Sequence, residues 1–104
     1  MLVTNTPTVP GKNISQILGV VRGNTVRSKN IGRDIAAGFK TLVGGEIKGY
    51  TEMLSQAREE AYNRMVNDAI KLKADAVVNI RFMTSSVMQA AAEILCYGTA
   101  VKLK

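Results

Sequence analysis

The sequence predicts a small α+β fold in which helices lie on one face of a sheet. Residues 14–26 are rich in β-branched side chains, and residues 46–73 carry an apolar stripe at helical spacing. Two further apolar stretches, residues 74–83 and 93–101, have the length and composition of strands. The order strand, helices, strand, hairpin, strand therefore predicts a small sheet with its helices together on one side.

The first strand follows a short extended lead-in that contains Pro7 and Pro10 and ends in a turn. Within residues 14–26, Gly19 and Gly23 would weaken a strand but allow a bulge or the close approach of another backbone. We therefore expect something to pack flat against this strand.

Two helices are predicted between the first and second strands. Asn30 can cap a short amphipathic helix that begins at Ile31 and stops at Gly44-Gly45. The second helix, residues 46–73, would be roughly 40 Å long, which exceeds the width expected of a domain of this size. Either Gly49 breaks this helix or part of it contacts a neighbouring subunit.

The last two predicted strands differ in how apolar their two faces are. In residues 74–83, Val78, Ile80 and Phe82 should face the long helix, and residues 84–89 should form the reversal. The last strand is apolar or small on both faces, which suits the centre of the sheet. One chain of 104 residues cannot cover all this surface, so we expect self-assembly through the long helix and the outer sheet face.

The length and composition of the chain limit the classes of protein to which it can belong. The length predicts a single domain over residues 1–104. The formal charge of +6 fits a solvated surface better than a dedicated anionic partner. No apolar run reaches the roughly 18 residues of a membrane span, and the single cysteine suits a reducing compartment. We therefore expect a cytoplasmic protein without a membrane partner.

The side chains that carry metal and acid-base chemistry are scarce. The chain has no histidine, and Cys96 is its one cysteine and the only soft-ligand candidate. Soft metals need several thiolate or imidazole ligands, so we predict no metal site and interpret Cys96 as a packing residue. A histidine-based catalytic site is excluded, whereas a lysine, cysteine or carboxylate mechanism stays open. We expect no cofactor.

A possible anion site lies at the start of the first helix. Arg27, Lys29, Asn30 and Arg33 gather where free backbone amides favour negative charge. The alternative is an ordinary capped surface helix. Nucleic acid is disfavoured as a partner, because Tyr50, Tyr62 and Tyr97 are placed on apolar stripes rather than on a basic sheet face.

Six stretches of the chain together carry a family resemblance, namely Leu18-Gly-Val-Val-Arg-Gly-Asn-Thr-Val-Arg-Ser, Asn30-Ile-Gly-Arg-Asp, Gly44-Gly-Glu-Ile-Lys-Gly-Tyr-Thr, Ala57-Arg-Glu-Glu-Ala, Ala74-Asp-Ala-Val-Val-Asn-Ile-Arg-Phe and Glu93-Ile-Leu-Cys-Tyr-Gly-Thr-Ala-Val. With them the chain resembles the YbjQ-like family of small, uncharacterised bacterial proteins. The resemblance implies a dodecin-like β-α-β-β subunit whose three-stranded antiparallel sheet has the last strand in the centre. It also implies a ring-shaped homopentamer, and the family carries a heavy-metal-binding label.

Two classes of function remain from the sequence. The favoured one is a non-catalytic homo-oligomer that binds a small anionic ligand. The alternative is an enzyme that acts on an anionic substrate at a site assembled between subunits.

Overall fold

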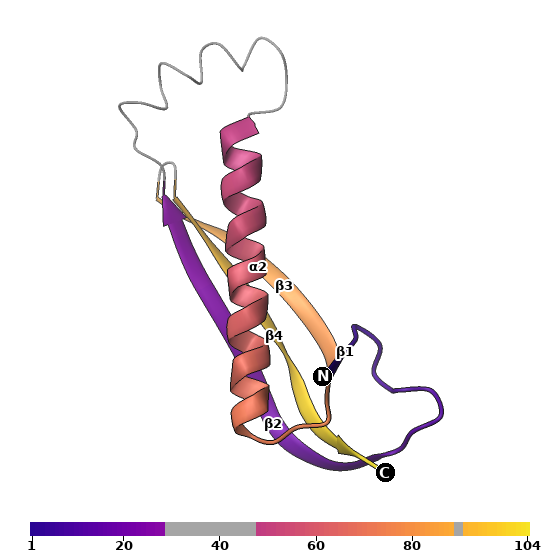
Figure 1. Cartoon of the computed structure of the whole chain (residues 1–104). Coiled ribbons are helices and arrows are strands. Elements are labelled where there is room, and N and C mark those ends of the chain that lie inside the picture. Colours follow the sequence, from indigo (N-terminus) through magenta and orange to yellow (C-terminus); the bar gives the residue numbers. More distant parts are fainter. Residues whose placement is uncertain (29–47, 89–90) are drawn as a thin grey trace.

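The computed structural model describes residues 1–28, 48–88 and 91–104. They form a four-stranded sheet and one long helix, α2, that crosses a single face of that sheet (Figure 1). The elements are β1 (Leu2–Val3), β2 (Ile14–Ser28), α2 (Lys48–Lys71), β3 (Ala76–Met88) and β4 (Ala91–Leu103). The α+β class and the placement of the long helix are confirmed, and the predicted first helix lies outside the described residues.

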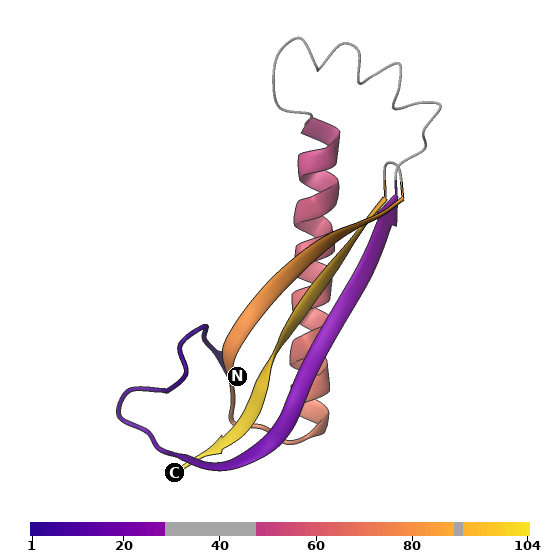
Figure 2. The ribbon, with the colours of Figure 1, turned by 180° about the vertical axis from the view of Figure 1, so that it is seen from behind.

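The sheet has the strand order β1-β3-β4-β2, so the last strand lies between two neighbours as predicted. Its three long strands are antiparallel. The prediction of three strands is wrong by one, because the lead-in adds β1 parallel to β3, pairing Leu2 with Ala76 and Val3 with Val77. Figure 2 shows the three long strands from behind, on the face away from α2.

The core lies between α2 and the strands β2 and β4. A stripe on α2 is fully buried because its residues are small or flexible enough to lie directly on the sheet, namely Ala57, Ala61, Met65 and Ala69. Gly23 of β2 makes this close packing possible, since a Cβ atom there would collide with the Ala61 carbonyl oxygen and the Met65 amide nitrogen. The predicted close approach of another backbone is therefore confirmed at Gly23.

The helix α2 runs without a break from Lys48, so Gly49 lies in its first turn. Polar contacts attach the helix to β2 beside the apolar core. The buried hydroxyl of Thr25 donates to the Ala57 carbonyl oxygen at 3.1 Å, and Arg64 donates to the Asn24 carbonyl oxygen at 2.6 Å. These bonds fix the height of α2 along the sheet.

Each long edge strand has two register shifts against β4. One shift in each lies near a strand end, between Ile14 and Gln16 in β2 and between Ser86 and Met88 in β3, and the other lies inside the sheet. The pairing of β2 with β4 shifts between Ile17 and Gly19, where Gly19 has a φ of 138°. The pairing of β3 with β4 shifts between Val78 and Arg81, and Asn79 there has a φ of 61°. Gly19 thus provides the bulge that its sequence position allowed, and Asn79 provides a second one that was not expected.

The bulge at Asn79 corrects the predicted faces of β3. Val78 belongs to a small second cluster with Ala76 and Val101 on the face away from α2, whereas Ile80 packs against the helix-side core. A single face for Val78, Ile80 and Phe82 would require unbroken alternation, which the extra residue removes.

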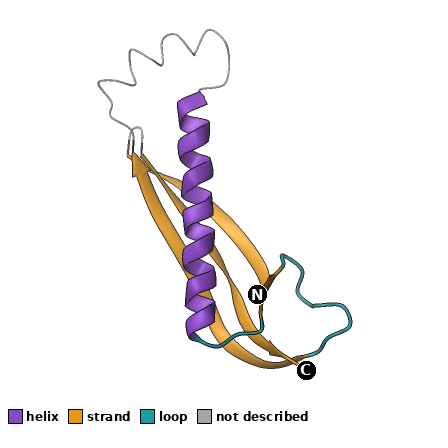
Figure 3. Ribbon diagram, viewed as in Figure 1, coloured by secondary structure: helices purple, strands orange, loops and turns teal. Residues whose placement is uncertain are grey.

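The predicted reversal at residues 84–89 is also wrong, because β3 continues to Met88. Thr84 and Ser85 pair with Ile94 and Glu93 of β4. The segment contains neither glycine nor proline to end the ladder, and its hydroxyl-bearing residues are compatible with a strand. The secondary structure of Figure 3 shows the resulting long hairpin of β3 and β4.

The two faces of the sheet are covered to different extents. Near the chain ends, Val9 and Leu103 pack on the second cluster and close the face away from α2. Farther along, every residue of β3 from Arg81 to Met88 is exposed. The sheet is therefore closed at one end and open at the other.

Candidate functional site

The predicted anion site is only partly within the described residues. Arg27 lies near the end of β2, and its guanidinium contacts the carboxylate of Glu60 on α2. Glu60 also contacts Arg64 one turn farther along the helix, at the i,i+4 spacing that favours such ion pairs. Lys29, Asn30 and Arg33 lie outside the described residues, so the site as a whole stays a prediction.

Cys96 lies on the helix-facing side of β4 and is fully buried. Its Sγ atom is 3.5 Å from the Sδ atom of Met65. Burial raises the pKa of the Cys96 thiol to about 11, so this group is protonated at neutral pH. This buried position is the one expected of a packing residue.

Carboxylates also occur singly in the described part of the chain. Within residues 1–28, 48–88 and 91–104, no three His, Cys, Asp or Glu side chains lie close enough together to hold a metal ion. Asp75 has a structural use, since its Oδ2 atom accepts from the Leu103 amide at 2.9 Å and its Oδ1 atom lies 3.7 Å from Lys102 Nζ. This carboxylate anchors the end of β4.

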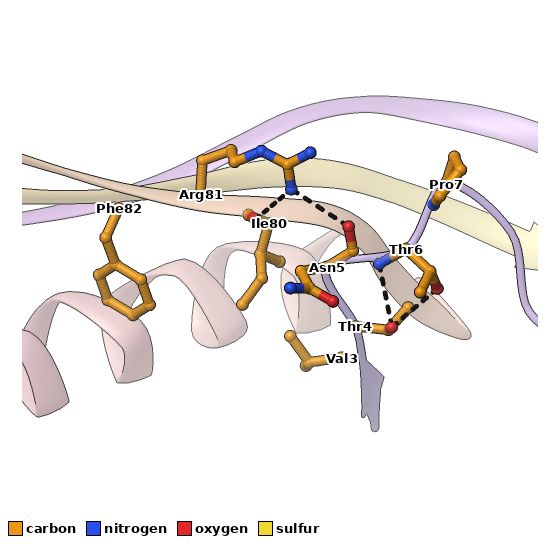
Figure 4. A pocket seen from close by; sticks show the side chains of 8 residues that line it. All are labelled: Val3, Thr4, Asn5, Thr6, Pro7, Ile80, Arg81 and Phe82. Atoms are coloured by element: carbon orange, nitrogen blue, oxygen red, sulfur yellow. Dashed lines mark hydrogen bonds between the residues drawn. The ribbon is translucent and has the colours of Figure 1, made fainter.

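An open groove of about 730 Å³ lies where β1 ends and the N-terminal segment leaves the edge of β3. It is lined by two adjoining segments, Val3-Thr4-Asn5-Thr6-Pro7 and Ile80-Arg81-Phe82 (Figure 4). Backbone hydrogen bonds hold the walls together, because Asn79 donates to the Thr6 carbonyl oxygen at 2.9 Å and Ile80 to that of Thr4 at 3.1 Å. The bulge in β3 thus forms one wall of the groove.

Arg81 is the charged residue of this lining. Its Nη1 atom donates to the carbonyl oxygens of Asn5 at 3.1 Å and Ile80 at 2.8 Å, and its Nη2 atom donates to Asn79 Oδ1 at 3.1 Å. All three acceptors are uncharged, and no carboxylate of the described residues forms a salt bridge with Arg81. The guanidinium is fixed in place while its charge is not compensated.

The register of β4 with its two neighbouring strands corrects the expectation that Tyr97 lies on an apolar stripe. Tyr97 of β4 pairs with Arg22 on one side and with Arg81 on the other. Directly paired residues of antiparallel strands share a face, so Tyr97 lies between two arginines rather than on an apolar stripe. Tyr62 does pack against the core, and the side chain of Tyr50 is outside the described set.

The sequence argument missed the groove at Arg81. A usable signal was present, since Arg81 is the one charged residue of the otherwise uncharged stretch 76–83. The groove itself depends on β1 and on the bulge at Asn79, and neither was predicted. Of the helices that the structure describes, none has the length and apolar character needed to cross a membrane.

Fold and sites together define a small α+β protein with one described helix on a mixed sheet. A family model with the description "Putative heavy-metal-binding" matches residues 1–104. The chain belongs to this YbjQ family, as its resemblance implied.

Relatives of similar length carry the name UPF0145 protein. One from Methanoculleus marisnigri is 65% identical over 103 residues, which cover 99% of this chain and 96% of the relative. One from Thermotoga maritima is 62% identical over 104 residues, covering 100% of this chain and 98% of the relative. Because the relatives include archaeal proteins, the family is not confined to bacteria.

The fold is also similar to that of a solved structure from Pediococcus pentosaceus, described as a protein of unknown function in the DUF74 family. The TM-score is 0.68 at 18% sequence identity, and the match covers 100% of this chain and 98% of the other. At this identity the likeness supports the fold and carries no activity with it.

Proposed function

We infer that this chain is a non-catalytic subunit of a homo-oligomer, a ring-shaped homopentamer, in which a neighbouring copy covers the open end of the sheet. The observation that carries this proposal is the second half of β3, residues 83–88, which we call the β3 arm. Met83, Val87 and Met88 on the arm are 52%, 51% and 63% exposed. Apolar side chains in such a cluster favour contact with another protein surface.

The composition of the arm favours a second copy as that surface. None of its six residues, Met83-Thr-Ser-Ser-Val-Met88, carries a charge, so burial against a protein requires no ion-pair desolvation. Ile17, Val20 and Val26 of β2 are 69%, 70% and 56% exposed. The same subunit thus offers two apolar surfaces, on opposite edges of the sheet.

The strand order supports a ring. Among the described strands, β2 pairs only with β4, and β1 pairs with β3 only at Ala76 and Val77. The arm and β2 are therefore two different open edges, which present unpaired backbone groups. Contact between the β3 edge of one copy and the β2 edge of the next would be head-to-tail, and such contacts form a ring when the rotation between copies closes. The family resemblance implies that the ring contains five subunits.

The overall dimensions fit a subunit rather than an independent domain. The radius of gyration is 17.4 Å and the principal extents are 55 × 23 × 17 Å. A compact domain of this length has a radius of gyration of about 13 Å. An elongated single chain leaves more apolar surface in water than a compact one, and association removes that cost.

Ligand binding is the second part of the proposal, with the anion site of Arg27, Lys29, Asn30 and Arg33 as its location. The contact of Arg27 with Glu60 means that an anion must compete with a carboxylate there. Titration with inorganic phosphate, followed by amide chemical shifts, tests this site, and unchanged shifts around Asn30 would refute it. An enzyme acting on an anionic substrate between subunits would need the same assembly.

Light scattering during size exclusion tests the assembly. The wild-type protein should have a mass about five times the 11.2 kDa of one chain. Met83→Glu should shift it toward the monomer, because the change places an unpaired charge in the contact. Met83 is half exposed in the single subunit, so the variant should remain folded by circular dichroism.

Thr8→Glu is the matched control, since Thr8 is exposed and precedes Val9, which packs at the closed end of the sheet and not on the arm. This variant should keep the wild-type mass. A wild-type protein that is monomeric at micromolar concentration would contradict the assembly proposal, and a pentameric Met83→Glu would exclude the arm from the contact.

A further inference from the structure

The groove at the end of β1 has the features of a site for one small anion. The lining contains one cation, Arg81, and seven uncharged residues. Because carboxylate, thiolate and imidazole ligands are all missing from this lining, the groove is not suited to a metal ion. Because the guanidinium carries one positive charge, it favours a negatively charged ligand. A ligand with a single negative charge would neutralise it.

The hydrogen bonds of Arg81 leave donors for a ligand. A guanidinium has five N–H donors, and three of those in Arg81 point to Asn5 O, Ile80 O and Asn79 Oδ1. Two N–H donors therefore remain. The three hydrogen bonds within the protein already hold the guanidinium in place. A carboxylate that accepts hydrogen bonds from the two remaining N–H donors would therefore bind a preorganised partner.

The threonine hydroxyls have a different role. Thr6 Oγ1 donates its proton to the Thr8 carbonyl oxygen at 2.7 Å, so in its 2.8 Å contact with Thr4 Oγ1 the Thr4 hydroxyl must be the donor. Both hydroxyl protons are thus used within the segment. They stiffen the wall of the groove and leave recognition of an anion to Arg81 and the exposed amide of Asn5.

The opposite side of the β3 edge is apolar. In Figure 4, Phe82, Ile80 and Val3 lie on one side of β3 and the Arg81 guanidinium lies on the other, above Asn5. The Phe82 side chain is 44% exposed, and its ring is available for stacking or edge contact. A ligand along this edge can place an apolar body against Phe82 and an anionic end against Arg81.

We propose that this groove binds a small organic monocarboxylate with an apolar, ring-sized body. A carboxylate has the two oxygens that match the two remaining donors of Arg81, whereas inorganic phosphate lacks the apolar body and carries more charge than one arginine balances. The volume of about 730 Å³ is within the range of small-molecule sites. This site is separate from the predicted anion site near Arg27 and does not depend on the assembly proposal.

Benzoate is the probe that tests the site, with benzamide and inorganic phosphate as comparison ligands. Titration of the wild-type protein, followed by amide chemical shifts, should move residues 4–6 and 80–82 with a benzoate dissociation constant on the order of 1 mM. Benzamide keeps the ring but lacks the charge, and phosphate keeps charge but lacks the ring. Both should bind at least tenfold more weakly.

Arg81→Gln should weaken benzoate binding at least tenfold, while Arg58→Gln should leave it unchanged. Arg58 is an exposed arginine on α2 whose Nη2 atom donates to Ser55 Oγ at 3.2 Å. Equal binding of benzamide, equal binding of phosphate at the same residues, or unmoved shifts at about 10 mM benzoate would each overturn the proposal. The ligand comparison uses the unaltered protein, so it holds even if Arg81→Gln perturbs the fold.

Discussion

At the scale of single residues, the distance between α2 and the sheet depends on side chains that are absent or small. Gly23 has no side chain that would collide with the helix backbone, and the buried alanines of α2 are small enough for the helix to lie close to the sheet. Met65 and Cys96 fill the remaining space, with their sulfur atoms 3.5 Å apart. Cys96 is thus held by packing from both the helix and the sheet.

The first prediction concerns this thiol. Burial holds the pKa of Cys96 at about 11, against an ordinary value of 9.0. Between these pH values the unfolded chain has lost a proton that the folded chain retains, so the free energy of unfolding should fall as pH rises through this window. The loss should approach about 2 kcal/mol near pH 11.

Urea unfolding of wild type and Cys96→Ser across this pH range measures the effect. The variant should start with modestly lower stability and lack this part of the decline, whereas lysine and tyrosine ionisation occur in both proteins. Identical pH dependence in the two proteins would show that burial does not perturb the thiol.

At the scale of elements, β4 holds the sheet together, since it pairs with β2 on one side and β3 on the other. Val101 is fully buried on its outer face, between Ile17 and Ala76 in the register. The sequence could predict this strand as central because both of its faces are apolar or small. It could predict α2 because the stripe of alanines and apolar side chains repeats at helical spacing.

Other elements could not be predicted from local pattern. The positive φ of Asn79 is accompanied by hydrogen bonds from Asn79 and Ile80 to Thr6 and Thr4, which are distant in sequence. Once that bulge exists, the side chains beyond it change face. Arg81 reaches Asn5 only through this arrangement, which is why the groove was missed while the packing role of Cys96 was predicted.

The second prediction tests the central strand. Val101→Asp should cost more than about 3 kcal/mol or abolish folding, because it buries an unpaired charge. Ile17→Asp is a control on the same rung of the ladder, where the native side chain is 69% exposed, and its effect on subunit folding should be much smaller. Urea unfolding followed by circular dichroism compares them. A folded, assembled Val101→Asp protein would rule out this placement of the strand.

At the scale of the whole molecule, the closed and open ends of the sheet differ in how their faces are covered. The closed end has α2 on one face and Val9 and Leu103 on the other. The open end has the uncharged, exposed β3 arm. Because none of the described residues covers this second end, the stability of the folded chain should depend on neighbouring copies.

The third prediction follows from that dependence. If assembly covers the arm, the thermal midpoint of the wild-type protein should rise by several degrees for a hundredfold increase in protein concentration, because association stabilises only the folded state. Met83→Glu should have a lower midpoint that does not vary with concentration. Circular dichroism melts over this range provide the measurement, and a concentration-independent wild-type midpoint would oppose an obligate assembly.

The two inner bulges, at Gly19 and Asn79, lie at nearly the same level of β4, opposite residues 97–101. Counting the shifts near the strand ends, each edge strand has two places where it carries one residue more than β4, whereas β4 has no extra residue of its own on either side. An insertion or deletion at Gly19 or Asn79 changes a local bend, but the same change within β4 inverts the faces of the whole ladder. Natural length variation among such chains should accordingly collect at the edges of the sheet and spare its middle.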